Sequence, residues 1–556
     1  MIIGPVCQDV LVSSPSPLAG DTASPAAPAA HVAPERTGSR LDDWWARVLR
    51  TPLRLKLWYW GAPLGVTLLA AILRLWNLGS PHVLVFDETF YVKDAWSLFH
   101  LGYEGSWPDK ADQSFAAGNT DVFNSSPSFV AHPPLGKWII ALGMAATGAG
   151  NSFGWRLSTA IVGILAVLVV FLIARMLFNS TILATIAGFL MAIDGHAIVM
   201  SRVALLDDIV MFFALLAFGC ILLDRRWHAT RLAARVAAER SAGRDPAWGP
   251  VIWWRPWLIS AGILTGLCAG VKWSGFYFLA FFAVYTVVVD LVARRRAGIA
   301  FYISSSILKQ APATFVLMVP IAFLSYLATW TGWLVTSGGY YRNWAESVHA
   351  QWTGGLSWVP LWFQNLWHYQ SEMYGYSINL HVPHPYQANP LTWLLMIRPT
   401  SMYYTGNAYG QAGCTAPGGC SAAITSLGNP IIWWAAAAAV LYLVYRLARY
   451  REWQIGLILT GLAAGYLPWL LYINRTIFQF YSIAFEPYLI LALTAVIGIV
   501  LGRRTDTEHR RRRGIAWTTV FLAVVTAVSV FFWPLWTAQQ VPFWYWQIHM
   551  WLPSWV

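Results

Sequence analysis

The sequence predicts an all-α polytopic membrane protein with about eleven transmembrane helices. Of its 556 residues, 57% are hydrophobic and only 11% are charged. Apolar segments of spanning length alternate with short arginine runs, the pattern of cytoplasmic loops in membrane proteins. Its 34 tryptophans also exceed what packing of a soluble core requires. The net charge of +12 is concentrated in those runs, so we expect a lipid environment and no nucleic-acid partner.

The first element in chain order is an N-terminal segment, residues 1–56, that begins rich in Ala, Pro and Ser. It lacks an apolar run long enough for a signal peptide, so we expect a cytoplasmic and largely disordered tail. The first span, 57–76, follows Arg47, Arg50 and Arg54 and therefore runs outward. Loop 77–154 is then extracytoplasmic.

The remaining spans alternate in direction so that each arginine run stays inside. The apolar stretch 257–293 is too long for one span and is interrupted by VKWSG, so we expect two short helices there that meet near the outer side. The other spans are expected at 155–174, 180–200, 206–223, 310–334, 430–447, 454–473, 476–501 and 515–536. These divide the chain into a membrane core (57–334), an outer loop (335–428), C-terminal membrane helices (429–536) and an outer tail (537–556).

Two segments of loop 77–154 predict helices that lie on the membrane surface. Residues 87–100 place aromatic and aliphatic side chains opposite acidic ones at helical spacing. The apolar part of 132–146 is too short to cross a bilayer, and its prolines stand where a helix starts. We expect both in the outer interface.

Cys414 and Cys420 lie close together in the polar segment CTAPGGC of the outer loop. That spacing permits a small disulfide if the loop faces an oxidising space. Cys220 and Cys268 lie within apolar runs, where cysteine acts as a small hydrophobic residue.

Charged residues at the outer ends of several spans are candidates for function, because ionisable groups are costly at membrane depth. Asp87 and Glu88 follow the first span; helix capping and catalysis both explain an acidic pair there. Lys272 stands between the two short helices and either serves a site or extends to the interface. The other candidates are Asp194, His196, Arg202, Asp207 and Asp208, for which structural ion pairs and buried hydrogen bonds are the alternatives, and Arg475, Gln479, Ser482 and Glu486, whose spacing predicts one polar face of a helix.

An outward-facing carboxylate pair beside basic groups suits transfer of a sugar from a lipid phosphate to a hydroxyl. A carboxylate can accept the proton of the attacking hydroxyl, and Arg475 or Lys272 can pair with the phosphate. The histidines at 132, 381 and 384 form no metal-binding spacing, so we expect no metal. The chain has no P-loop, no GxSxG and no dinucleotide fingerprint.

An ordered set of motifs resembles the protein O-mannosyltransferase family of the GT-C superfamily, in its actinobacterial form. The motifs are FDETFYVKDA, HPPLGKW, WRLSTAIVG, SRVALLDD, VKWSG and the terminal MWLPSW. The resemblance implies transfer of mannose from polyprenyl-phosphate-mannose, with inversion, to Ser or Thr of proteins emerging from the secretion channel. It implies no metal or other cofactor.

The resemblance also assigns roles to residues. Asp87 and Glu88 match the family's acidic pair, and Asp87 is expected to be the catalytic base. Apart from the roles that the resemblance assigns, we expect Arg475, Lys272 and Arg202 at the donor phosphate, with supporting or substrate-contacting roles for His132, Arg156, Asp207, Asp208, Gln479, Tyr481 and Glu486. The chain departs from eukaryotic relatives in having Phe90 where they carry His, and in an outer loop 335–428 too short for their sugar-binding-like domain. The Trp and Tyr side chains of loop 335–428 are candidate contacts for the acceptor or the donor sugar.

Two other functions remain compatible with these patterns. A GT-C enzyme that glycosylates a lipid or a polysaccharide would carry a similar external carboxylate pair and phosphate site. A lipid transporter would line its path with charged residues, although the sequence shows no internal repeat of the kind many transporters have.

Overall fold

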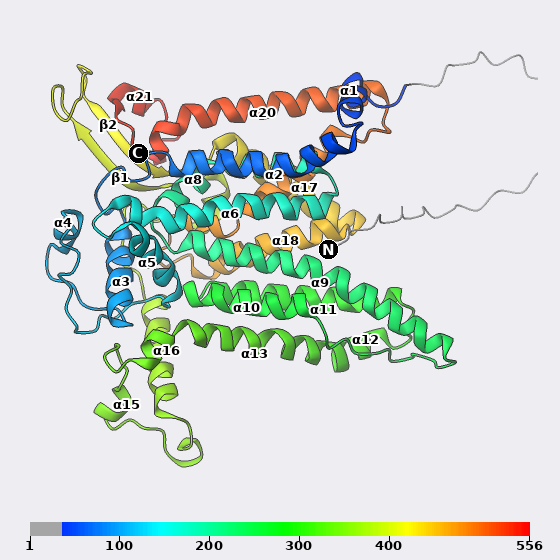
Figure 1. Cartoon of the computed structure of the whole chain (residues 1–556), viewed down its shortest axis with the longest axis horizontal. Helices are drawn as coiled ribbons and strands as arrows, with labels where there is room; N and C mark the ends of the chain where they lie inside the picture. Colours follow the sequence, from blue (N-terminus) through cyan, green and yellow to red (C-terminus); the bar gives the residue numbers. More distant parts are fainter. Residues whose placement is uncertain (1–35) are drawn as a thin grey trace, which may run out of the picture.

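The computed structural model describes residues 36–556, which form a bundle of long, roughly parallel helices (Figure 1). The predicted tail falls mostly on residues 1–35, outside the described residues. The bundle helices are α2 (Pro52–Leu75), α6 (Ser152–Phe178), α7 (Thr181–Ile193), α8 (Gly195–Arg202), α9 (Asp207–Ser241), α10 (Pro256–Val271), α11 (Gly275–Arg296), α13 (Ala311–Thr329), α17 (Pro430–Tyr450), α18 (Trp453–Tyr466), α19 (Glu486–Leu501) and α20 (Glu508–Trp536).

Within residues 36–556, seven helices are long and apolar enough to cross a membrane, or eight if α7 and α8 form one bent span. Together they make this a multi-pass membrane protein. The apolar helices α10 and α19 have 16 residues each, fewer than a full span requires. The eleven-span topology therefore stays a prediction.

The span predicted at 180–200 is not one continuous helix, because the chain bends by 58° between α7 and α8. Asp194 ends α7, and its side chain accepts the backbone N–H of His196 at 2.9 Å, which caps α8. Gly195 follows with no room for a side chain, since an added Cβ would lie 1.9 Å from the Trp536 ring.

The two short helices predicted around VKWSG are confirmed as α10 and α11. Lys272 and Trp273 lie in the break between them. Gly275 permits this turn, because an added Cβ would lie 2.3 Å from the backbone nitrogen of Ala269. The break therefore places a lysine at the end of two apolar helices.

The end of the bundle that carries α3, here called the α3 end, holds most of the remaining structure (Figure 1). The predicted interfacial segments form α3 (Glu88–Leu101) and α5 (Leu135–Thr147). The outer loop contains the predicted Cys414–Cys420 disulfide, which the structure confirms. Other elements here are α4 (Ala111–Ala116), α14 (Thr331–Val335), α15 (Trp344–Ser347), α16 (Leu361–Ile378), α21 (Phe543–Gln547) and an antiparallel sheet ordered β1 (Thr400–Asn407), β2 (Cys420–Ser426), β3 (Val541–Pro542).

The opposite end, here called the basic end, carries α1 (Arg40–Val48) and α12 (Tyr302–Ser305) (Figure 1). Residues 40–48 of the predicted tail are thus helical. Ser39 and Asp42 form a capping box at the start of α1. Asp42 also binds Arg511 of α20 through two oxygens, at 2.9 and 2.8 Å, which holds α1 against the bundle.

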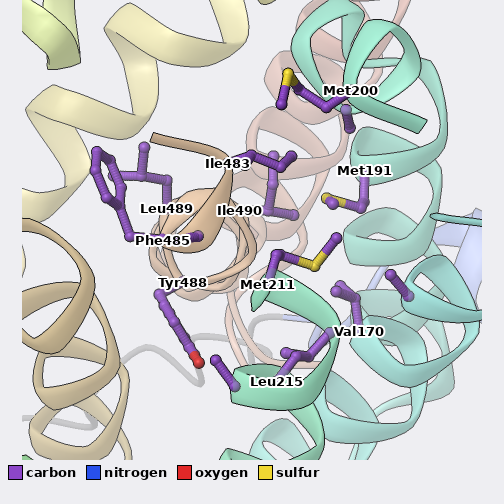
Figure 2. Close-up of a cluster of buried hydrophobic side chains, with 14 of the residues drawn as sticks. Val170, Met191, Met200, Met211, Leu215, Ile483, Phe485, Tyr488, Leu489 and Ile490 are labelled. Carbon is purple, nitrogen blue, oxygen red and sulfur yellow. The ribbon is translucent and has the colours of Figure 1, made fainter. Parts of the chain in front are cut away.

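The interior of the bundle is packed with aliphatic, methionine and aromatic side chains (Figure 2). Met191, Met200 and Met211 come from α7, α8 and α9, and they meet Ile490 of α19 in the same cluster. Methionine adapts to irregular gaps, which suits a region where the broken α7–α8 segment crosses other helices. This packing holds the helices whose ends form the α3 end.

The predicted single helix at 476–501 is wrong in its first third. Gln479–Ala484 form a 3₁₀ helix, and α19 begins only at Glu486. Pro487 explains the start, because proline is accepted in the first turn of an α-helix but not in its interior. Arg475, Gln479, Ser482 and Glu486 therefore do not form one face of an α-helix.

Candidate active site

Asp87 stands at the N-terminus of α3 with a side chain that is partly accessible. Its carboxylate makes no capping hydrogen bond to α3, so capping does not account for it. Burial raises the pKa of Asp87 to about 6; nearby Lys272 lowers this pKa and Asp207 raises it. A carboxylate of this pKa is ionised at neutral pH and more basic than ordinary aspartate, as a general base requires.

Glu88 is fully buried and bound on both carboxylate oxygens. Arg156 of α6 donates from Nε and Nη2 at 2.8 and 2.9 Å, forming a two-pronged ion pair. The backbone N–H groups of Val85 and Ala204 complete the set, each at 2.9 Å. Adjacent acidic residues thus have different environments, and Glu88 positions the start of α3 rather than facing a substrate.

Phe86, which precedes Asp87, has a positive φ of 48°, an unfavourable backbone conformation for a bulky residue. Its ring packs edge-on against Phe478, Phe480 and His384, with centroids 5.8, 5.6 and 6.1 Å away. Those contacts stabilise the turn that leads into Asp87.

Lys272, in the break between α10 and α11, bonds to Asp207 at the start of α9, with Nζ 2.7 Å from Oδ2. The same ammonium lies 5.0 Å from the ring centroid of Tyr481 and 5.9 Å from that of Tyr91. Tyr91 lies one helical turn after Asp87 on α3. Three segments distant in sequence therefore meet the α10–α11 break at this lysine.

A cavity of about 220 Å³ lies at this junction. Its wall includes one side of α16, the VKWSG break and the segment before α19. Arg475 lines it, and its Nε is buried with no hydrogen-bond partner among the described residues. The predicted residues that line it are His132, Asp207, Lys272, Arg475 and Tyr481.

The His132 imidazole faces several cations near the cavity. Burial lowers the pKa of His132 well below its usual value, and Lys272, Lys137 and Arg475 lower it further. The neutral ring can donate or accept one hydrogen bond at the cavity without adding charge.

The structure does not bring every predicted residue to the cavity. Arg202 donates to backbone carbonyls at the end of α2, including those of Arg74 and Trp76 at 3.0 and 2.6 Å. Asp208 and Glu486 are fully buried and do not line the cavity. Gln479 bonds to Ser482, which contacts the buried His196.

Several aromatic residues of the site were not among the predicted ones. Tyr277 and Tyr472 line the cavity and join their hydroxyls at 3.1 Å, and Tyr374 comes from α16. A place for Tyr91 beside Asp87 could have been predicted from their spacing, since side chains four residues apart share a helix face.

No group of three or more His, Cys, Asp or Glu side chains suited to hold a metal ion occurs in residues 36–556. The site offers instead one partly accessible carboxylate, two cations and tyrosine hydroxyls. Such a set can bind a phosphate and accept a proton.

Two family profiles match the chain. "Dolichyl-phosphate-mannose-protein mannosyltransferase" covers residues 64–335, and "C-terminal four TMM region of protein-O-mannosyltransferase" covers residues 362–555. Together they include most of the described chain, and the site residues fall within them.

Similar curated proteins share about a third of their residues with this chain. The polyprenol-phosphate-mannose-protein mannosyltransferase of Mycolicibacterium smegmatis (strain MKD8) is 32% identical, over 89% of this chain and 93% of the relative. The protein of the same name from Mycobacterium tuberculosis (strain H37Rv) is also 32% identical, over 88% and 90%. That of Corynebacterium glutamicum is 30% identical, over 85% and 88%.

Among solved structures, the Saccharomyces cerevisiae protein O-mannosyltransferase Pmt1-Pmt2 complex bound to the sugar donor has a chain with a TM-score of 0.66. At 15% identity, over 94% of this chain and 95% of that one, this likeness shows the shared GT-C fold. The profiles and the actinobacterial relatives decide the family. The chain belongs to the dolichyl-phosphate-mannose-protein mannosyltransferase family, a family of glycosyltransferases.

Proposed function

We propose that the protein transfers mannose from polyprenyl-phosphate-mannose to Ser or Thr hydroxyls of proteins on the extracytoplasmic side of the cell membrane. The similar mycobacterial proteins are named for this donor and for protein acceptors. The arginine runs support a cytoplasmic basic end and an extracytoplasmic α3 end. Acceptors include polypeptides leaving the secretion channel.

One observation carries the site assignment. Asp87, partly accessible and with a raised pKa, lies near the Lys272–Asp207 pair, and the adjoining cavity contains the unpartnered Nε of Arg475. Distant parts of the chain thus contribute the base, Asp87, and the two cations for the phosphate, Lys272 and Arg475.

The proposed reaction is a single displacement at the anomeric carbon. The acceptor hydroxyl oxygen attacks that carbon on the face opposite the phosphate, and its proton passes to the Asp87 carboxylate. The bond between the anomeric carbon and the phosphate oxygen breaks, and polyprenyl phosphate leaves with the bonding electrons. Arg475 and Lys272 stabilise the growing negative charge, and the configuration inverts.

Asp87→Asn tests the base. The amide keeps the size of the side chain but cannot accept the proton, so transfer should fall by about 10²-fold or more. Purified protein in nanodiscs, supplied with radiolabelled polyprenyl-phosphate-mannose and a Ser/Thr/Pro-containing peptide, gives the rate. Asp109→Asn, an exposed change in the same loop, is the matched control. Undiminished transfer by Asp87→Asn would refute this mechanism.

Arg475→Ala tests the phosphate site. Loss of the guanidinium should raise the KM for the lipid donor about tenfold or more, whereas the KM for the peptide stays unchanged. An unchanged donor KM would reassign the phosphate to Lys272. Label appearing in membrane lipid or polysaccharide instead of peptide would reassign the acceptor.

We further propose that the transfer needs no resident metal. Arg475 and Lys272 supply the charge that a divalent ion would otherwise contribute at the leaving phosphate. Transfer should therefore survive dialysis against EDTA. Loss of activity that Mg²⁺ or Mn²⁺ restores would overturn this.

A further inference from the structure

A second cavity, here called the aromatic cleft, lies at the α3 end away from the donor cavity. Its volume is about 370 Å³. Paired residues of β1 and β2 supply part of its lining, Ser401 opposite Thr425 and Tyr404 opposite Ala423. Trp546 of α21 stands beside the Tyr404 ring, with centroids 5.3 Å apart. The hairpin thus contributes hydroxyl and small side chains, and α21 contributes aromatic ones.

The lining of the aromatic cleft includes no ionisable side chain except tyrosine phenols. Arg398 lies nearby, over the Tyr386 ring at 5.2 Å, but its guanidinium donates to main-chain oxygens of Pro385, Ser554 and Val556. A phosphate or an acidic segment therefore finds no available cation in this lining. The cleft suits an uncharged ligand that stacks on aromatic rings.

A line of aromatic side chains joins the aromatic cleft to Asp87. Tyr386 lines the cleft, and its ring centroid is 5.9 Å from that of His384. His384 in turn lies 6.1 Å from Phe86, the residue before Asp87. All three rings are partly accessible. A ligand lying along them would extend from the cleft to the carboxylate.

We propose that the aromatic cleft binds a proline-containing, uncharged segment of the acceptor polypeptide while the acceptor hydroxyl lies at Asp87. Proline-rich chains adopt an extended helix with little loss of entropy and bind to aromatic-lined grooves. The hydroxyl of Thr425 can donate to a backbone carbonyl that such a chain leaves unpaired. This inference rests on the proposed function, since it assigns a binding surface for its acceptor.

The geometry also sets a spacing between the bound prolines and the modified residue. The steps from Phe86 to His384 and on to Tyr386 are 6.1 and 5.9 Å. An extended proline-type helix advances ~3.1 Å per residue, so about four residues cover the full length of these two steps. A spacer of about four residues therefore suits occupation of both sites.

Direct peptide binding tests the cleft without requiring catalysis. Fluorescein-labelled peptides, one Thr/Pro-containing and one with every Pro changed to Ala, are titrated with the full chain in nanodiscs. Trp546→Ala should weaken binding of the proline peptide about tenfold. Trp544→Ala, an exposed tryptophan on the same helix outside the cleft, should leave it unchanged. Equal affinity of wild type and Trp546→Ala, or of the two peptides, overturns the proposal.

The spacer and a conservative variant separate a binding role from a structural one. Acceptor peptides with two, four, six or eight residues between Pro and Thr should show a KM that drops at about four. Trp546→Phe should retain this lower KM for peptides with the longer spacers. Trp546→Ala should lose it while keeping the kcat for a short peptide without proline. A KM independent of spacer length, or a Trp546→Ala protein unable to modify even the short peptide, contradicts the cleft assignment.

The two proposals fail separately. Trp546-dependent peptide binding without mannose transfer would overturn the proposed function and leave a peptide-binding cleft. Transfer to proline peptides that is unaffected by Trp546→Ala would keep the function and remove the cleft. Displacement of the bound peptide by an oligomannoside, with no difference between Pro and Ala peptides, would assign the cleft to sugar instead.

Discussion

At the scale of single residues, Asp87 and Glu88 show how environment separates two neighbouring carboxyl groups. Glu88 accepts four hydrogen bonds, two of them from Arg156, and has no exposed surface. Asp87 makes no capping bond and stays partly accessible. Of the two carboxyl groups, only Asp87 is therefore accessible to a substrate.

The raised pKa of Asp87 predicts how activity depends on pH. Below its pKa of about 6 the carboxyl is protonated and cannot accept a proton, so kcat/KM for the acceptor should fall about tenfold per pH unit on the acid side. Activity should be level from pH 6.5 upward until other groups titrate. Rates from pH 4.5 to 8 measure this, with Asp109→Asn as the control profile. A level profile down to pH 4.5 would show that the pKa of Asp87 is not raised in the working enzyme.

Phe86 should act as a positioning residue. Phe86→Gly suits the positive φ but removes the ring that packs against His384, Phe478 and Phe480. Small misplacement of a catalytic group costs about 10²-fold in rate, so kcat should fall by about 10- to 100-fold with the donor KM unchanged. Phe86→Tyr should retain the rate, and Phe90→Gly, at an exposed ring on α3, should have little effect on kcat. Wild-type kcat in Phe86→Gly would contradict this role.

At the scale of elements, the Glu88–Arg156 pair joins three separate parts of the chain. Arg156 belongs to α6, Glu88 begins α3, and Ala204 lies before α9. The same guanidinium binds the carbonyls of Pro81 and Val83, each at 3.0 Å, so it also orders the loop that leads to Asp87.

Removing one partner of this pair should destabilise the protein strongly. Arg156→Ala leaves Glu88 buried without its counter-ion, and loss of one partner of a buried pair costs about 3–5 kcal/mol. Arg156→Ala combined with Glu88→Gln should be more stable than Arg156→Ala alone, because no buried charge remains. Thermal unfolding in detergent measures all variants. A melting temperature of Arg156→Ala equal to that of wild type would show that the pair contributes little.

At the scale of the whole molecule, charge is distributed unequally between the two ends. The arginine runs at 294–296 and 510–513 lie in the last turn of α11 and the first turns of α20 at the basic end, whereas the candidate site lies at the α3 end (Figure 1). By the positive-inside rule, this asymmetry predicts that the basic end lies in the cytoplasm. Donor and acceptor would then meet outside the cytoplasm.

Cysteine labelling tests that orientation. With Cys7, Cys220 and Cys268 replaced by Ala, Ser357→Cys, between α15 and α16, should react with a membrane-impermeant maleimide in intact cells. Ser241→Cys, at the end of α9, should react only after permeabilisation. Both serines are exposed, so accessibility within the fold does not bias the comparison. The reverse labelling pattern would invert the topology and remove the extracytoplasmic site.

Much of the architecture was predictable because it depends on local patterns. The bundle, the helices α3 and α5, the break at VKWSG and the Cys414–Cys420 bond each follow from apolar length, spacing or turn residues in a short stretch. The bend at Asp194 and the 3₁₀ turn before α19 were missed, because a capping side chain and Pro487 override apolar periodicity there.

The site was predictable only in part. The sequence by itself determined which residue types stand at the outer ends of the spans, and His132, Asp207, Lys272, Arg475 and Tyr481 do meet at one cavity. Only the tertiary structure decided that Arg202 binds carbonyls of α2, that Glu88 pairs with Arg156 and that Asp87 stays accessible. The physical reason is that burial and hydrogen-bond partners come from segments far apart in the chain, whereas sequence patterns report only on neighbours.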